Sequence, residues 1–204
     1  MKLCYYELVI NKQKIILASG SKSRQTLLSA LGYSFEVVIS DFNEGKIKES
    51  DPSKRAAILA SSKGITVAKN YNGIIIAGDT YSVCENKVLE KPKSTKEAKE
   101  MLSQLSGNRA IGYTGFYYID KQNGVEVSET VETEVTFRNI YKEEINEYVE
   151  TFPVTTWAAA IAPSEVYVLG LIKSIKGSLT GWAYGLPSEL FVPLLAQSEH
   201  YPKP

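Results

Sequence analysis

The sequence predicts a globular α/β protein that forms one domain over residues 1–204. At 204 residues, of which 44% are hydrophobic, the chain is long enough for one sizeable core. Short apolar runs typical of strands alternate with segments of helical spacing. Two of the runs, residues 15–18 and 74–77, are apolar throughout, as strands covered on both faces are.

The first third of the chain predicts two or three strands around one helix. Residues 3–10 and 14–18 are predicted to pair as a hairpin, and the second run leads into the small polar turn Ser19-Gly20-Ser21. The helix that follows should end at Gly32, a residue that suits the left-handed position after a helix. Residues 35–39 are apolar and β-branched and predict a strand.

The middle of the chain predicts a long helix, a buried strand, a hairpin and a second helix. Asp51-Pro52 combines a capping residue with proline at the first helical position, and this helix should run to about Tyr71. Residues 74–80 predict a buried strand, and residues 81–89 a hairpin. Residues 94–107 begin with a capping-box pattern and end in glycine, which predicts a helix.

The last part of the chain predicts a second lobe and a closing helix. Residues 110–120 and 125–138 should form two long strands of a twisted hairpin, because the residues between them include Asn-Gly. Residues 142–151 predict a helix with a polar face, residues 166–175 a strand, and residues 187–197 the closing helix.

Charge and cysteine content restrict the partners and the location. The 23 Lys and Arg residues balance the 23 Asp and Glu residues, so no basic field attracts a nucleic acid polymer, and the expected ligand is small. No apolar run approaches the roughly 18 residues of a membrane span, and we expect no membrane partner. Cys4 and Cys84 form no metal-spaced pair or disulfide framework, and the N-terminus lacks the features of a signal peptide. The cytoplasm is therefore the expected location.

The turn after residues 15–18 is a candidate phosphate site. The unpaired N–H groups of a first helical turn and the helix dipole favour an anion there. Arg24 shares the inward helix face with Leu27 and Leu28, which makes sense if an anion is bound beside it. A second interpretation remains open, in which Ser21 only caps the helix and Arg24 pairs with a carboxylate elsewhere.

Three more charged residues occupy unusual positions. Lys63 lies on the apolar stripe of its predicted helix, where it either meets a ligand or extends its ammonium to water. Asp79 ends a buried strand, where ligands gather in open α/β sheets, although such a carboxylate can also cap a turn. Lys91 precedes Pro92, which holds it in an extended conformation near a chain reversal.

Four segments of the sequence carry a family resemblance, LASGSKSRQTLL, AGDTYSV, VLEKPKSTKEAKEMLSQLSG and IKGS…YGLP. They occur in the same order in the Maf-like nucleoside triphosphate pyrophosphatases, which the chain resembles over about residues 15–195. The resemblance implies a curved mixed sheet flanked by helices, with two lobes and a central cleft, like the inosine-triphosphate pyrophosphatases. It also implies hydrolysis of a nucleoside triphosphate to the monophosphate and pyrophosphate with Mg²⁺ or another divalent metal such as Mn²⁺. A house-cleaning role for standard or modified nucleotides would fit this activity.

The resemblance also assigns roles to individual residues of this chain. It implies catalytic roles for Asp79, Lys91 and Lys63, and metal binding by Glu44 and Asp79. The substrate-binding residues that it implies are Ser19, Ser21, Arg24, Thr80 and Glu165, the last falling near a glutamine of the family.

Two departures from the family leave its finer properties open. Lys22-Ser23 replaces a Pro-Arg pair, so one arginine is missing and its bidentate geometry is lost. Residues 156–165 replace an Asp-Lys-Ala-Gly run and a glycine-rich turn, so the preferred base is not carried over. The retained charged residues favour an enzyme, and the alternative is a nucleotide-binding regulatory protein with weak or no turnover. A homodimer is one assembly that we consider.

The inward cations allow two opposite expectations for stability. If Arg24 and Lys63 hold phosphates, replacing either by Met should leave the stability of the empty protein unchanged or slightly higher. If each is paired with a buried carboxylate, the replacement strands that charge and should cost roughly 3–5 kcal/mol.

Overall fold

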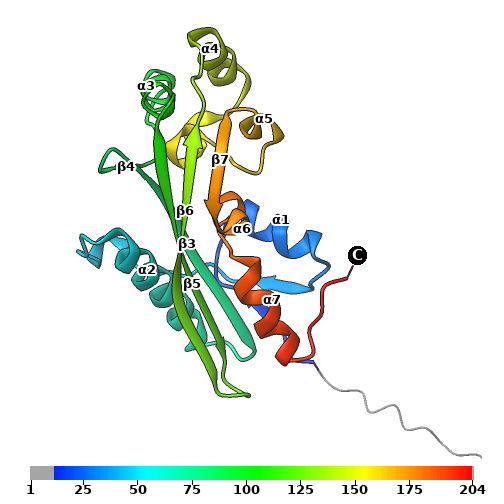
Figure 1. Cartoon of the computed structure of the whole chain (residues 1–204). Helices are drawn as coiled ribbons and strands as arrows, with labels where there is room; N and C mark the ends of the chain where they lie inside the picture. Colours follow the sequence, from blue (N-terminus) through cyan, green and yellow to red (C-terminus); the bar gives the residue numbers. More distant parts are fainter. Residues whose placement is uncertain (1–11, 204) are drawn as a thin grey trace, which may run out of the picture.

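The computed structural model describes residues 12–203 and contains a mixed sheet of seven strands (Figure 1). The strand order is β2-β1-β3-β5-β6-β7, with β4 paired to β3. β1 pairs in parallel with β2 and β3, and the remaining pairs are antiparallel. The strands are β1 (Ile15–Leu17), β2 (Phe35–Val37), β3 (Ile74–Cys84), β4 (Lys87–Leu89), β5 (Arg109–Asp120), β6 (Val125–Phe137) and β7 (Ile172–Gly177). The predicted mixed α/β fold is confirmed.

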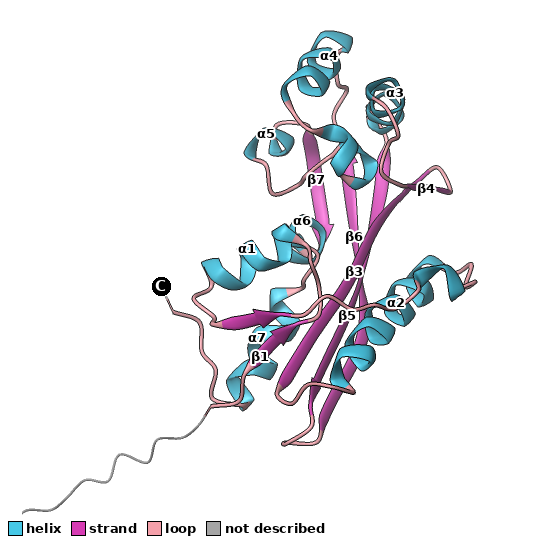
Figure 2. Cartoon of the chain, turned by 180° about the vertical axis from the view of Figure 1, so that it is seen from behind, coloured by secondary structure: helices cyan, strands magenta, loops and turns pink. Residues whose placement is uncertain are grey.

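Helices cover both faces of the sheet and one of its ends. Figure 1 shows α2 on one face and α1, α6 and α7 on the other, while Figure 2 shows the same arrangement from behind. α3, α4 and α5 gather at the far end, which gives the molecule a second lobe. The α-helices are α1 (Lys22–Ala30), α2 (Pro52–Ala68), α3 (Thr95–Leu105), α4 (Lys142–Thr151), α5 (Val166–Leu169), α6 (Leu179–Tyr184) and α7 (Ser188–Gln197), and the 3-10 helices are η1 (Glu44–Lys46), η2 (Val154–Thr156) and η3 (Ala158–Ala160). Within residues 12–203, no helix is long and apolar enough to cross a membrane.

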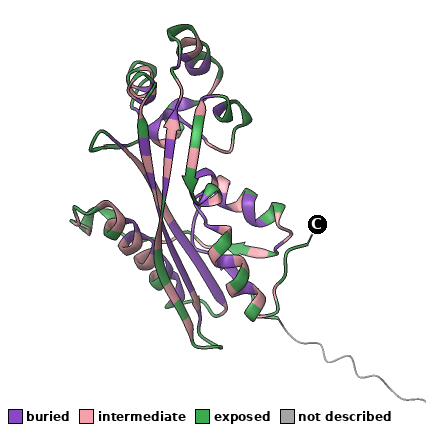
Figure 3. Ribbon diagram, in the orientation of Figure 1, coloured by how far each residue is buried: buried purple, intermediate pink, exposed green. Residues whose placement is uncertain are grey.

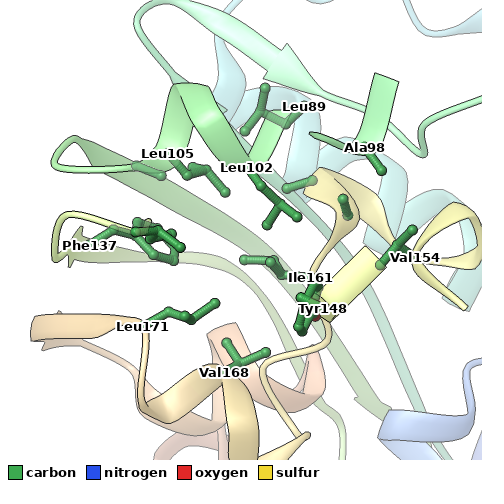
Figure 4. Packing of buried hydrophobic residues seen from close by; sticks show 14 of the residues in the cluster. Leu89, Ala98, Leu102, Leu105, Phe137, Tyr148, Val154, Ile161, Val168 and Leu171 are labelled. Carbon is green, nitrogen blue, oxygen red and sulfur yellow. The ribbon is translucent and has the colours of Figure 1, made fainter. Parts of the chain in front are cut away.

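The core lies on both faces of the sheet and under the far lobe (Figure 3). Successive residues of β3 alternate between faces, so Ile74 and Ile76 join the cluster with α1 and α7, whereas Ile75 and Ala77 join the cluster with α2. A third cluster fills the space between the sheet end and α3 and α4 (Figure 4). The sheet is therefore covered on both sides, as its apolar strands predict.

α2 packs closely against β5 at two glycines. A Cβ added at Gly115 would lie 1.9 Å from the carbonyl oxygen of Ala56, and one added at Gly64 would lie 2.1 Å from the ring of Tyr117. Gly115 therefore lets the backbones of helix and strand touch, and Gly64 makes room for the Tyr117 ring. The contact fixes how far any α2 side chain stands from the strands below.

Replacing Gly115 by Ala is expected to destabilise the fold by about 1–3 kcal/mol, because the new methyl group must push α2 away from the sheet. Urea unfolding of both proteins measures this difference. Gly170→Ala is the control, since the nearest atom to its added Cβ lies at 3.2 Å and this glycine is exposed. Equal stability of the Gly115→Ala protein and the wild type would show that α2 is not held by this contact.

Three elements differ from their prediction. The hairpin of β5 and β6 is no separate lobe, because β5 pairs with β3 over the whole length of β3. The predicted strand of residues 166–175 is wrong in its first half, where α5 forms one helical turn before Gly170 and β7 begins only at Ile172. The long helix ends at Ala68 rather than Tyr71. A short apolar run has no clear period, so the sequence alone does not separate a helical turn from a strand.

Two other segments need comment. The predicted strand at residues 3–10 lies outside the described residues, and β1, its expected partner, has β2 on one side and β3 on the other. α6 was not predicted, although both of its ends carry a signal. The Ser178 side chain accepts a hydrogen bond from the N–H of Gly181, and Gly185 follows the helix with a φ of 73°.

Candidate functional site

β3 has an open stretch on one of its two edges. β5 covers one edge from Ile74 to Cys84, so β1 and β4 share the other. Pairing with β1 reaches only to Ile76, and pairing with β4 covers only Ser82 to Cys84, so no described strand pairs with the edge between Ile76 and Ser82. Within this gap Asp79 and Thr80, which face opposite sides of the sheet, are partly exposed. The turn after β1 lies beside them, since Arg24 joins Ser19 to Thr80.

Arg24 crosses from α1 to this gap and is buried there. Its Nε donates to the carbonyl oxygen of Gly185 at 2.9 Å, its Nη1 to the Ser19 hydroxyl at 2.7 Å, and its Nη2 to the Thr80 hydroxyl at 3.4 Å. None of the described carboxylates forms an ion pair with Arg24. The structure therefore does not support the interpretation in which Arg24 pairs with a carboxylate.

Two glycines make room for this guanidinium group. A Cβ at Gly78 would lie 3.1 Å from the Arg24 Nε and 2.8 Å from the carbonyl oxygen of Gly185. Gly185 has a φ of 73°, a conformation that costs a residue with a side chain more than it costs glycine. The Arg24 side chain thus lies in a pocket made by two glycines and two hydroxyl groups.

Lys63 joins two carboxylates on the opposite side of β3. Its Nζ lies 2.6 Å from Asp79 Oδ1 and 2.9 Å from Glu44 Oε1. The side chains of Lys63 and Asp79 are 16% and 15% exposed, whereas that of Glu44 is 56% exposed. α2 carries the lysine, β3 the aspartate and η1 the glutamate. The structure brings these three residues together, and Lys63 is paired with carboxylates rather than extended to bulk water.

The two groups of charges influence each other across β3. Burial lowers the pKa of the Arg24 guanidinium from its ordinary value, and the negative charges of Asp79 and Glu44 oppose this effect. Arg24 thus carries a positive charge that hydrogen bonds to neutral groups only partly compensate. Such a site attracts an anion.

A cavity of about 480 Å³ opens in front of Arg24 and Thr80. Ser21 and Lys91, two further predicted residues, also line it. The side chain of Ser21, the N-cap residue of α1, makes no capping hydrogen bond, so the N–H groups of the first turn remain available. Lys91 is exposed and forms no ion pair within the described part of the chain. One wall of the cavity is therefore cationic.

Glu165 stands apart from the other predicted residues. It is exposed and lines a second cavity of about 300 Å³, which shares Trp157 and Tyr184 with the first cavity. Neither aromatic residue belongs to a motif in the sequence. The signal that could have pointed to Trp157 is a large aromatic residue next to a run of alanines.

Comparison with known proteins agrees with the motifs in the sequence. The family model for Maf-like protein matches residues 14–198. A dTTP/UTP pyrophosphatase of Geotalea uraniireducens (strain Rf4) is 37% identical over 179 residues, which cover 86% of this chain and 90% of that protein. A dTTP/UTP pyrophosphatase of Bacillus cereus (strain ATCC 10987 / NRS 248) is 43% identical over 140 residues, or 68% of each chain.

Among solved structures, a nucleoside-triphosphatase / dITP/XTP pyrophosphatase from Mycobacterium abscessus aligns with a TM-score of 0.39 and 17% identity, over 62% of this chain and 75% of that one. The family match, in contrast, spans nearly the whole described chain and includes the strands and helices around the gap in β3. This chain therefore belongs to the family of Maf-like proteins.

Proposed function

We propose that this protein hydrolyses a nucleoside triphosphate to the monophosphate and pyrophosphate, with dTTP and UTP as its best substrates. The observation that carries the proposal is a buried arginine that lines a cavity beside Thr80 and pairs with none of the described carboxylates. Asp79, the residue before Thr80 on β3, pairs with Lys63 on the other face of the strand. The names of the two relatives described above support the choice of substrate. We place the activity in the cytoplasm and in a single domain over residues 1–204, and a homodimer stays a prediction.

The phosphate chain lies along the cationic wall in this proposal. A triphosphate carries about four negative charges, so it needs several positive groups and N–H donors at once. Arg24 and the N–H groups of the first turn supply them from α1, and Lys91 supplies a further cation from the segment after β4. Because Arg24 is held by neutral acceptors, its charge remains available to a phosphate oxygen.

Asp79 and Glu44 fit a divalent metal ion. Their oxygens share one ammonium group, so both can point at a single site. No described group of three or more His, Cys, Asp or Glu residues could hold a metal. Mg²⁺, however, is commonly bound by one or two carboxylates, with water and phosphate oxygens as its other ligands. Bound there, Mg²⁺ or Mn²⁺ would offset negative charge on the phosphates and lower the pKa of a nearby water.

Asp79 has a second task in the reaction. Its carboxylate would accept a proton from the water that attacks the α-phosphorus. A new bond forms between the water oxygen and the α-phosphorus, and the bond from that phosphorus to the α,β-bridging oxygen breaks. The products are the monophosphate and pyrophosphate, and pyrophosphate leaves with the electron pair of the broken bond. Lys63 holds Asp79 in place at 2.6 Å.

The test is a panel of standard and modified nucleoside triphosphates with Mg²⁺ or Mn²⁺ in water enriched in ¹⁸O. We expect monophosphate and pyrophosphate in equal amounts, the ¹⁸O label in the monophosphate, and the highest kcat/KM for dTTP and UTP. Label in the pyrophosphate would mean attack at the β-phosphorus and would contradict the proposed mechanism. Tight nucleotide binding without product would instead favour the regulatory protein.

A further inference from the structure

We propose that Trp157 is the residue on which the nucleobase stacks, so that the segment 156–165 selects the base in this chain. This inference rests on the proposed function, because it concerns the non-phosphate end of the same substrate. It assigns a role to a side chain that the sequence motifs leave without one.

The lining of the cavity is of mixed polarity. It includes the cations Arg24 and Lys91 and also the apolar side chains of Trp157, Ile161 and Pro163. A nucleotide has the same two kinds of surface, since its phosphates are charged and its base is a flat aromatic ring. With the phosphates bound by the cations, the apolar side chains remain to contact the base.

Four aromatic side chains line the cavity, and two of them, Tyr81 and Trp182, are buried. Trp157 and Tyr184 also line the second cavity, so they stand where the two cavities meet. Tyr184 directly precedes Gly185, whose carbonyl group accepts a hydrogen bond from Arg24, so this tyrosine lies near the phosphate-binding group. Trp157 belongs to the segment that supplies most of the apolar lining. The indole is therefore better placed for the base than the phenol.

The segment around Trp157 holds its side chain firmly. Its indole is partly buried and packs at 6.2 Å, between ring centroids, from Phe152. Two residues later, the N–H of Ala159 donates to the carbonyl oxygen of Glu90, the neighbour of Lys91. Ile161 points into the core cluster of the far lobe (Figure 4). The indole thus has a fixed platform and a remaining surface that faces the two cavities.

The backbone of this segment is itself unusual. Ala159 and Ala160 have φ values of 57° and 59°, in the left-handed region that residues other than glycine rarely adopt. Such a conformation costs free energy and persists where the surroundings impose it, which happens mainly at functional sites. Both alanines are buried, and they turn the chain between Trp157 and Ile161.

The test compares a ligand with a base to one without. The ligands are a non-hydrolysable α,β-methylene analogue of UTP and inorganic tripolyphosphate, and calorimetry measures the Kd of each in Mg²⁺. Stacking on an aromatic side chain is worth about 1–3 kcal/mol per base, so Trp157→Leu should weaken binding of the analogue roughly 5- to 150-fold. Binding of tripolyphosphate should change less than twofold, because it makes no contact with the indole.

Two further variants make this result specific. Trp157→Phe keeps an aromatic face and should restore most of the affinity for the analogue. Tyr71→Leu removes an exposed aromatic residue outside both cavities and serves as the matched control. Equal losses for both ligands, or no loss for either, would overturn the role of Trp157.

The inference and the proposed function can fail separately. A wild type that binds the analogue but hydrolyses no triphosphate would contradict the enzyme and leave the stacking residue intact. A wild type that hydrolyses UTP, with a Trp157→Leu variant of unchanged Kd for the analogue, would contradict the stacking residue alone.

Discussion

Asp79→Asn is expected to lower kcat by about 10² to 10⁴, the range that the loss of general-base assistance typically costs. The amide keeps the shape of the side chain but neither accepts the proton of the attacking water nor offers a second anionic oxygen to a metal. The fold should persist, because Lys63 retains Glu44 as an ion-pair partner at 2.9 Å. Steady-state kinetics with UTP, together with a melting curve, measures both effects.

The control for this variant is Glu143→Gln, which removes an exposed carboxylate from α4, in the far lobe. It should leave kcat unchanged. Removing divalent metal with EDTA should abolish wild-type activity, and restored Mg²⁺ should recover it. Full activity in EDTA, or an Asp79→Asn protein within a few-fold of the wild type, would refute the assignment of Asp79.

Lys63→Met and Arg24→Met are expected to change the stability of the empty protein differently. Lys63 is paired with two carboxylates, so its removal leaves Asp79 largely buried beside Glu44 without a cation. We expect a loss of about 2–3 kcal/mol, less than for a fully buried pair, because the site retains some exposure. Arg24 has no carboxylate partner, and its removal should change the free energy of unfolding by at most about 1 kcal/mol.

Added ligands should stabilise the two variants to different extents. Mg²⁺ should raise the melting temperature of the Lys63→Met protein more than that of the wild type, because it replaces the missing cation between Asp79 and Glu44. The Arg24→Met protein should lose most of the stabilisation that the α,β-methylene analogue of UTP gives the wild type. A large drop in the stability of the empty Arg24→Met protein, with stabilisation by the analogue intact, would show that Arg24 is structural.

The sequence predicts most elements of the sheet and the residues around the gap in β3. The inward positions of Arg24 and Lys63 follow from helical period alone, and Asp79 follows from the end of an apolar run. Local patterns do not reveal which charges meet, because that depends on how α2 lies on β3. The pairing of Lys63 with Glu44 and Asp79 is a tertiary result of this kind.

The segment after α4 is where sequence reasoning was weakest. Short 3-10 turns and two left-handed alanines have no hydrophobic period, so they match no helix or strand pattern. Their conformation is imposed by distant contacts, such as the hydrogen bond from Ala159 to Glu90. Trp157 was overlooked for the same reason, since only the folded chain brings it beside the cavity.

The close backbone contact between α2 and β5 at Gly115 has a consequence for how this protein can change over evolution. Asp79 on β3 pairs with Gly115 on β5, so α2 and two paired strands set the spacing of Lys63 and Asp79. The apolar residues of the cavity come instead from a loop anchored in another core cluster. Substitutions in that loop can alter which base is accepted while the groups that face the triphosphate keep their places. The architecture thus separates the part of the substrate that is constant from the part that varies, and new specificities become accessible without rebuilding the reaction.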